Sequence, residues 1–146
     1  MGNHTVGHAD LTAADISKVQ QELGGIEDKY LEITGQKMKK FFRPPEGRYS
    51  EHLLSVAEGL GYTTVFWSFA YKDWIGDDQP DHEAAKEKIL SRTHPGAVML
   101  LHSTSETNAA ILGDVIDAWR AEGYEIVSLE AAVGENMLVN GHKFNA

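Results

Sequence analysis

Apolar residues recur at intervals of three and four in the first part of the chain, which is typical of one face of an amphipathic helix. The positions are Ile16, Val19, Leu23, Ile26, Tyr30 and Ile33. Thr12 is the predicted cap, because Asp15 follows three residues later as in a capping box, and Gly35 is the predicted end. Gly24-Gly25 lies inside the pattern, and since each glycine costs about 1 kcal/mol in a helix interior, we expect a kink or break there.

Strand patterns alternate with helical patterns along the rest of the chain. Short runs rich in apolar, aromatic or β-branched residues predict strands at 41–43, 62–68, 97–101 and 125–129. The helical pattern returns at 53–60, 82–90 and 111–119, with Ser50 and Asp81 as predicted caps. The run 97–101 is wholly apolar, which predicts a central strand covered on both faces. Asn140-Gly141 is a predicted hairpin turn.

This alternation predicts a parallel sheet with right-handed crossovers, and hence an α/β fold. The pattern fits both an open, doubly wound sheet and part of a barrel. A chain of 146 residues has the length of one domain, so we expect a single domain over 1–146 with its own core.

Composition narrows the classes of partner. The net charge of −9 disfavours nucleic acid and anionic membrane surfaces, since both are bound through clusters of Lys and Arg. The absence of cysteine excludes disulfides, thiolate metal sites and cysteine nucleophiles. No apolar run approaches the ~18 residues of a membrane span. A neutral or weakly charged ligand suits the chain best.

Polar clusters interrupt the chain at four places. They are His4 with His8, the Arg-Pro-Pro-Glu-Gly run at 43–47, Asp73 with Trp74, and Leu100 with His102. Arg43, Asp73 and His102 each end or follow a predicted strand, so we expect them at the carboxyl edge of the sheet, where α/β proteins bind ligands. The spacing of His4 and His8 puts two imidazoles on one side of a helical turn and suits a divalent metal such as zinc.

Each cluster also has a structural interpretation. Two histidines four residues apart occur often by chance. Arg43 fits a surface cation whose stem packs on a neighbouring Phe. Asp73 fits a loop carboxylate beside a packed Trp74, and His102 fits a buried histidine bonded to the backbone. The remaining histidines, assigned to the surface or to packing, are His52, His82, His94 and His142.

Together and in this order, the clusters resemble the polysaccharide deacetylases of the NodB-homology type, carbohydrate esterase family 4. The matching motifs are His4-Thr5-x-x-His8, Arg43-x-Pro45-x-Gly47 and Leu100-x-His102, and the resemblance runs from residue 2 to about residue 130. It is closest to the delta-lactam-biosynthetic de-N-acetylases, which act on muramic acid in peptidoglycan. The resemblance implies a parallel sheet in a partial, distorted (β/α) barrel. The domain is expected to be N-terminally truncated and to lack its first strands, because the family's Thr-Phe-Asp-Asp motif does not occur in the sequence.

The resemblance makes His4 and His8 ligands of a divalent metal, expected to be zinc. The family's third ligand is the second aspartate of the missing motif, so we expect the site to be incomplete. Asp10 is near in sequence, but no feature of the sequence indicates that it substitutes.

The resemblance also assigns catalytic and binding roles. Arg43 is implied to orient the catalytic aspartate, and the Glu46 N–H is implied to help hold the oxyanion. Asp73 is implied to pair with His102, the general acid, because a neighbouring carboxylate favours a charged, proton-donating imidazole. The implied substrate-binding residues are Pro45, Glu46, Gly47, Trp74 and Leu100.

The implied reaction is metal-dependent hydrolysis of N-acetyl groups from amino sugars of a cell-wall glycan, first of all peptidoglycan N-acetylmuramic acid, at the cell envelope or outside the cell. General base catalysis contributes about 10²–10⁴-fold, and the aspartate base is missing, so we expect this chain alone to be weak or inactive. The alternatives are a non-catalytic glycan-binding or structural remnant of a deacetylase, and an unrelated doubly wound domain. Missing strands expose sheet edges, so a homodimer is expected.

Overall fold

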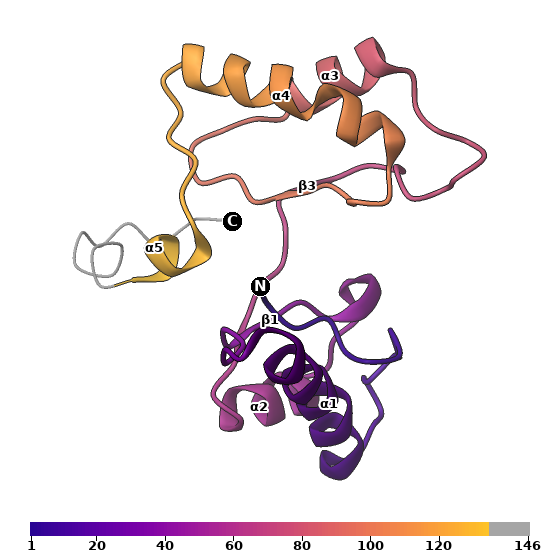
Figure 1. Cartoon of the computed structure of the whole chain (residues 1–146), viewed down its shortest axis with the longest axis vertical. Helices are drawn as coiled ribbons and strands as arrows, with labels where there is room; N and C mark the ends of the chain where they lie inside the picture. The colour runs from indigo at the N-terminus through magenta and orange to yellow at the C-terminus, as the bar shows by residue number, and fades with distance from the viewer. Residues whose placement is uncertain (135–146) are drawn as a thin grey trace. The chain divides into compact units, whose positions relative to one another are not determined.

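The computed structural model describes residues 1–134, and the chain divides into two compact units after Phe66 (Figure 1). Unit 1 is Met1–Phe66, and unit 2 begins at Trp67. Each unit has a parallel pair of short strands and its own apolar core, which confirms the α/β class. Within residues 1–134, no helix is long and apolar enough to cross a membrane.

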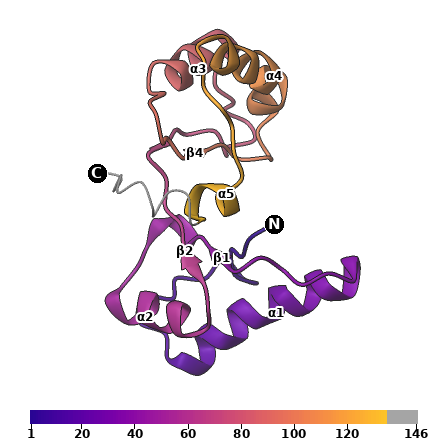
Figure 2. The same cartoon turned by 90° about the vertical axis from the view of Figure 1, so that its left-hand side faces the viewer.

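Unit 1 combines two helices with two strands. Its elements are α1 (Ile16–Thr34), β1 (Phe41–Phe42), the 3-10 turn η1 (Pro45–Gly47), α2 (Glu51–Gly59) and β2 (Thr63–Thr64). Strands β1 and β2 are parallel, with Phe41 opposite Thr63, and Asn3 adds one parallel bridge to Phe42. Both helices lie below the strands in Figure 2. The core of the unit consists of Leu11, Val19, Leu23, Phe42, Leu53, Ala57 and Tyr62.

The start of α1 differs from the prediction, and its end agrees. Thr12 is not the cap, because α1 begins only at Ile16; the Thr12 hydroxyl donates to Asp10 at 2.7 Å. Asp15 is the cap, since its carboxylate accepts the Lys18 N–H at 2.8 Å. Gly35 ends the helix as predicted, with a left-handed φ of 68°.

The expected kink at Gly24-Gly25 is absent, because α1 continues through both glycines. A Cβ on Gly25 would lie 2.8 Å from Val6 Cγ2. The missing side chain therefore lets the loop that carries Val6 approach the helix closely. This contact gives Gly25 a packing role that the helical pattern does not show.

Unit 2 combines two packed helices with two strands. Its elements are β3 (Phe69–Ala70), α3 (His82–Leu90), β4 (Met99–Leu100), α4 (Glu106–Ala121) and α5 (Leu129–Val133). Strands β3 and β4 are parallel, with Phe69 opposite Met99, and α3 lies beside α4 above them in Figure 1. The core consists of Phe69, Tyr71, Ala85, Ile89, Ile111, Val115 and Trp119.

The caps predicted for the second and third helices are confirmed. Ser50 accepts the Leu53 N–H at 3.1 Å and caps α2. Asp81 accepts the Ala84 N–H at 3.0 Å and caps α3. The predicted helix at 111–119 is the later part of α4, which begins at Glu106 because Ser105 caps it.

The predicted strand 62–68 is wrong in extent, because this run contributes to two different sheets. Thr63–Thr64 form β2, and Val65 donates to the Phe42 carbonyl at 2.8 Å. Further on, Ser68 donates to the Val98 carbonyl at 2.9 Å, and the second strand, β3, begins at Phe69. The periodic pattern is continuous across a position where the hydrogen-bonding partner changes.

Two other strand predictions are corrected. The run 97–101 is not a covered central strand, since only Met99–Leu100 pair, with β3 alone among the described strands, and Val98 is 38% exposed. The run 125–129 is not a strand, because Ser128 caps α5 and Ile126 is 54% exposed. The hairpin at Asn140-Gly141 lies outside the described residues, and the homodimer stays a prediction.

Candidate active site

The His4–His8 pair lies on an irregular loop, which corrects the helical turn expected from its spacing. Thr5 and His8 have left-handed φ values of 67° and 51°, which a right-handed helix excludes. The loop still brings the two rings edge to face, with centroids 4.9 Å apart. Imidazoles so close together offer two of the nitrogen donors that a zinc site takes.

His4 is oriented by a backbone carbonyl. Its Nδ1 lies 2.6 Å from the backbone oxygen of Arg43. Because a carbonyl oxygen can only accept, Nδ1 carries the hydrogen, and the neutral ring keeps its lone pair on Nε2. Metal-binding histidines are commonly oriented in this way. The same hydrogen bond joins two of the predicted clusters, those of His4 and Arg43.

Glu22 on α1 holds the loop between the two histidines, and the sequence analysis missed it. Its Oε2 accepts the N–H groups of Val6 and Gly7 at 3.0 and 2.9 Å, and its Oε1 pairs with Lys18 at 2.8 Å. The Lys18 ammonium and then the Gly7 N–H lower the pKa of Glu22, which is 6% exposed. The available signal was an acidic residue on the apolar face of the predicted helix.

Asn3 anchors the start of this loop. Its buried side chain accepts the Thr5 N–H at 2.9 Å and donates to the Leu23 carbonyl and the Tyr62 hydroxyl, both at 2.8 Å. Thr5 is buried as well, and its hydroxyl has no hydrogen-bond partner within residues 1–134. A buried polar group in this state costs about 1–3 kcal/mol, so a further polar group beside Thr5 would be stabilising.

The turn after β1 carries the Arg43 cluster. Two prolines lead into η1, in which Glu46 and Gly47 have left-handed φ values of 56° and 70°. Arg43 is half-buried, and burial lowers the pKa of its guanidinium, which remains a cation. The exposed Glu46 carboxylate pairs with Arg48 Nε at 2.9 Å, so this side chain is engaged within the turn.

Asp10 is engaged elsewhere and does not join the histidine pair. One carboxylate oxygen accepts the Thr12 N–H and hydroxyl at 3.0 and 2.7 Å, and the other accepts from Arg48 at 3.0 Å. The Thr12 hydrogen bonds and then Arg48 lower the pKa of Asp10 to about 2. Both oxygens therefore already have donors.

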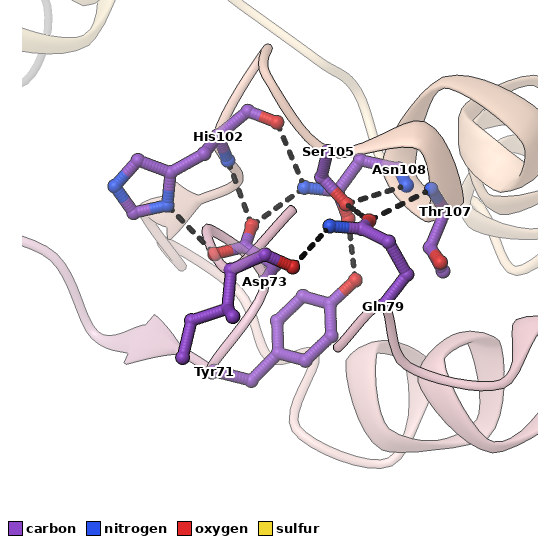
Figure 3. A network of polar contacts seen from close by, with 8 residues as sticks. Tyr71, Asp73, Gln79, His102, Ser105, Thr107 and Asn108 are labelled. Carbon is purple, nitrogen blue, oxygen red and sulfur yellow. Dashed lines mark hydrogen bonds and ion pairs between the residues drawn. The ribbon is translucent and has the colours of Figure 1, made fainter. Parts of the chain in front are cut away.

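Asp73 and His102 form the predicted pair (Figure 3). His102 Nδ1 lies 2.7 Å from Asp73 Oδ1, and the His102 backbone N–H donates to Oδ2 at 2.8 Å. The carboxylate is fully buried, whereas the His102 side chain is 30% exposed. The interpretation of His102 as a buried histidine bonded to the backbone is wrong, because the ring's partner is a carboxylate.

Trp74 and Leu100 lie near this pair in the chain. Trp74 is 56% exposed, and its ring stands edge-on to that of His102 with centroids 5.5 Å apart. The interpretation of Trp74 as a packed indole is therefore wrong, and its ring forms an exposed apolar surface beside His102. Leu100 is half-buried on β4.

Asn108 on α4 completes the surroundings of Asp73, and the sequence analysis missed it. Its amide nitrogen donates to Asp73 Oδ2 at 2.6 Å and to the His102 carbonyl at 3.0 Å. The Tyr71 hydroxyl donates to its amide oxygen. The available signal was an amide residue in register with Ile111 on the apolar face of the predicted helix.

The predicted residues are thus assembled within each unit. Unit 1 joins His4, His8 and the Arg43 backbone, and unit 2 joins Asp73, Trp74 and His102. The expected gathering of Arg43, Asp73 and His102 at one sheet edge stays a prediction, as do the assigned roles. His52, His82 and His94 are exposed, as predicted, while His142 lies outside the described residues.

The histidine pair fits part of a zinc site. The donor atoms and the orientation of His4 suit a divalent metal. A catalytic zinc takes three protein ligands, and residues 1–134 contain no group of three His, Cys, Asp or Glu side chains that could hold a metal. His4 and His8 are therefore the ligands that the described part of the chain can contribute.

Known proteins resemble this chain along most of its length. Residues 1–65 match the family model described as polysaccharide deacetylase. The peptidoglycan-N-acetylmuramic acid deacetylase PdaA of Bacillus subtilis is 38% identical over 130 residues, which cover 89% of this chain and 49% of that protein. The chain spans about half the length of the curated relatives it matches.

Solved structures agree with this relationship. The structure of B. subtilis PdaA, a family 4 carbohydrate esterase, superposes with a TM-score of 0.85 at 37% identity, covering 89% of this chain and 56% of that one. A family 4 carbohydrate esterase from Bacillus anthracis gives a TM-score of 0.71 at 38% identity, covering 89% and 54%. These matches confirm the predicted partial (β/α) fold and the predicted similarity to the polysaccharide deacetylases, the family 4 carbohydrate esterases.

Proposed function

We propose that this chain supplies the metal-ligating histidines and the proton donor of a site that removes N-acetyl groups from amino sugars of a cell-wall glycan. N-acetylmuramic acid in peptidoglycan is the first candidate substrate, because the similar B. subtilis protein is a peptidoglycan-N-acetylmuramic acid deacetylase. The observation that supports the proposal most is the hydrogen bond of 2.7 Å between the fully buried Asp73 carboxylate and His102. A partly exposed imidazole with a buried anionic partner is suited to donate protons.

Hydrolysis of an acetamide requires a proton for the departing amine. His102 would donate it from Nε2, because Nδ1 is bonded to Asp73. Asp73 would keep the ring turned in this direction and balance the charge of the imidazolium. The exposed Trp74 ring beside His102 would form an apolar wall for the sugar.

The residues of unit 1 would act on the acetyl group. His4 and His8 would hold a divalent metal, proposed to be zinc, which as a Lewis acid polarises the carbonyl and its attacking water. The backbone N–H of Glu46 would stabilise the oxyanion, and Arg43 would orient an aspartate base. Pro45 and Gly47 would line the substrate site. In unit 2, Leu100 would lie beside the acetyl methyl group.

The proposal includes weak activity of this chain alone. The sequence has no Thr-Phe-Asp-Asp motif, which provides the base and the third metal ligand in the family it resembles. Loss of general base catalysis typically costs about 10²–10⁴-fold in rate. Joining an N-terminal segment that bears the two aspartates is therefore expected to raise activity by at least this amount.

The test compares acetate release from peptidoglycan by the chain and by the version extended with the aspartate segment. We expect little acetate from the chain and clear release from the extended version. Replacement of His102 by Asn in the extended version should reduce the rate by about 10²–10⁴-fold. No acetate from the extended version with either peptidoglycan or chitin oligomers would reject the proposal. Retained glycan binding in that case would favour the non-catalytic remnant.

A further inference from the structure

Asn108 is placed to control the carboxylate of Asp73. It lies near the start of α4, is 5% exposed, and its backbone N–H is already bonded to the capping Ser105 hydroxyl at 3.1 Å. Its side chain is therefore not needed to cap the helix. Figure 3 shows this side chain directed at Asp73 from the side opposite the His102 ring.

The amide of Asn108 completes the set of donors around the carboxylate. Asp73 Oδ1 is bonded to His102 Nδ1, and Oδ2 accepts both the His102 backbone N–H at 2.8 Å and the Asn108 amide at 2.6 Å. The Asn108 amide also donates to the His102 carbonyl at 3.0 Å. The Asn108 side chain thus links the Asp73 carboxylate to the backbone of His102, whose ring that carboxylate orients.

Three partners fix which way the Asn108 amide faces. Its nitrogen donates to two groups that only accept, the Asp73 carboxylate and the His102 carbonyl, and its oxygen accepts from the Tyr71 hydroxyl. Burial, and then the charge of Asp73, raise the pKa of Tyr71, so the hydroxyl keeps its hydrogen at neutral pH. The reversed amide would place its oxygen against the Asp73 carboxylate and the His102 carbonyl, which are acceptors only, and would leave the Tyr71 hydroxyl facing an amide nitrogen.

The start of α4 is held by the loop that follows Asp73. Gln79 Oε1 accepts from the Ser105 hydroxyl at 2.9 Å and from the Thr107 N–H at 3.3 Å. The Thr107 hydroxyl donates to the Pro80 carbonyl at 2.7 Å. Asn108 therefore projects from a backbone that is tied to the Asp73 loop, and a rigid support of this kind holds a functional side chain to fine tolerance.

We propose that Asn108 is a positioning residue, held in orientation by Tyr71, that keeps Asp73 bonded to Nδ1 of His102 and so leaves Nε2 for proton transfer. Its importance for catalysis rests on the function proposed above, whereas its effect on the His102 ring is a property of the chain itself. Asn108 acts through Asp73 and has no direct part in the chemistry.

The tautomer of the His102 ring tests this positioning role directly. With Asp73 ionised, its carboxylate only accepts, so the neutral ring is expected to be the single tautomer with hydrogen on Nδ1. Nitrogen-15 NMR of the full chain, recorded at a pH high enough to keep the ring neutral, distinguishes the two ring nitrogens by their chemical shifts. In Asn108→Leu, which removes the amide at similar volume, we expect the two nitrogen shifts to move toward each other as tautomers mix. Tyr71→Phe should shift them in the same direction to a smaller extent.

Thr93→Val is the matched control. The Thr93 hydroxyl accepts from Trp119 Nε1 at 2.7 Å within the same unit, and no hydrogen bond connects it to Asp73. This variant should lower stability without changing the His102 ring. Nitrogen shifts in Asn108→Leu that match those of the native chain would overturn the proposal. If Asn108→Leu does not fold, unchanged shifts in Tyr71→Phe overturn it. The measurement needs no substrate, so absence of acetate release would reject the proposed function alone.

Discussion

The two units orient their site histidines with different acceptors. In unit 1, His4 Nδ1 faces the Arg43 carbonyl at 2.6 Å. In unit 2, His102 Nδ1 faces the Asp73 carboxylate at 2.7 Å. A neutral carbonyl orients an imidazole without adding charge, which suits a metal ligand. A carboxylate orients the ring and can balance the charge of an imidazolium, which suits the proton donor proposed above. In the proposed function the same hydrogen-bond geometry therefore serves two chemistries, which differ in the charge of the acceptor.

The residues that hold the site histidines in place also differ between the two units. The loop of His4 and His8 is held mainly through backbone N–H groups, by Glu22 and Asn3. The Asp73–His102 pair is held mainly by side chains, through Asn108 and Tyr71. We expect substitutions in unit 1 to act on metal binding and substitutions in unit 2 to act on proton transfer.

Of the substitutions that test this difference between the units, removal of the Asp73 charge is expected to have the largest effect, on the rate of acetate release. In the version extended with the aspartate segment, Asp73→Asn should reduce acetate release by about 10²–10⁴-fold, because His102 loses the carboxylate that orients its ring for proton transfer. Zinc affinity should stay unchanged. The control is Asp78→Asn, which removes an exposed carboxylate paired with Lys72 in the same unit. Equal acetate release from the two variants would contradict the proposed role of Asp73.

Removal of an imidazole from unit 1 should act on the metal instead. His4→Ala is expected to weaken zinc binding by more than about 100-fold, since even residues that only orient a ligand contribute 10–100-fold. Zinc titration of the chain followed by calorimetry measures this. His52→Ala, which removes an exposed histidine from α2, is the control. Similar zinc affinities of the two variants would reject His4 as a ligand.

Glu22→Gln should have an intermediate effect. Loss of the carboxylate weakens the hydrogen bonds to Val6 and Gly7, so zinc affinity should fall about 10-fold and the free energy of unfolding by about 1–3 kcal/mol. Glu32→Gln, on the exposed side of the same helix and paired with Lys29, is the control. A loss of zinc affinity no greater than in the control would show that Glu22 does not position the loop.

The lowered pKa of Glu22 also predicts a pH dependence. Because its pKa is lower in the folded chain than in the unfolded chain, the stability it contributes is present above the unfolded pKa and is lost as the pH falls through the folded pKa. Denaturant unfolding at a series of acid pH values should therefore show a shallower loss of stability in Glu22→Gln than in the native chain. Parallel losses would contradict this assignment.

Asp10→Asn should have the smallest effect. Asp10 is exposed and bonded to Thr12 and Arg48, and its pKa near 2 reflects those hydrogen bonds. Exposed ion pairs contribute little to stability, so unfolding at neutral pH and zinc affinity should both stay close to native values. A marked loss of zinc affinity would show that Asp10 reaches the metal after all.

Local features of the sequence determined much of the fold. The caps Ser50 and Asp81 and the left-handed end at Gly35 follow from hydrogen bonds or backbone conformations within a few residues. The alternation of helical and strand patterns was sufficient to predict the α/β class. The predicted cap of α1 was wrong. Thr12 is bonded to Asp10 outside the helix, and the Asp15 carboxylate accepts the Lys18 N–H as the cap.

Tertiary structure alone decided the partners of the site residues. The strand pattern at 62–68 could not show that one end pairs with β1 and the next residues with β4. The motifs named His4 and His102, but the contacts of Glu22 with the loop and of Asn108 with Asp73 join residues 15 to 35 positions apart. Such contacts depend on how helices pack, and packing depends on the whole core. Motifs, periodicity and capping describe only positions along the chain, so the sequence identified the histidines but not the acceptors that orient their rings.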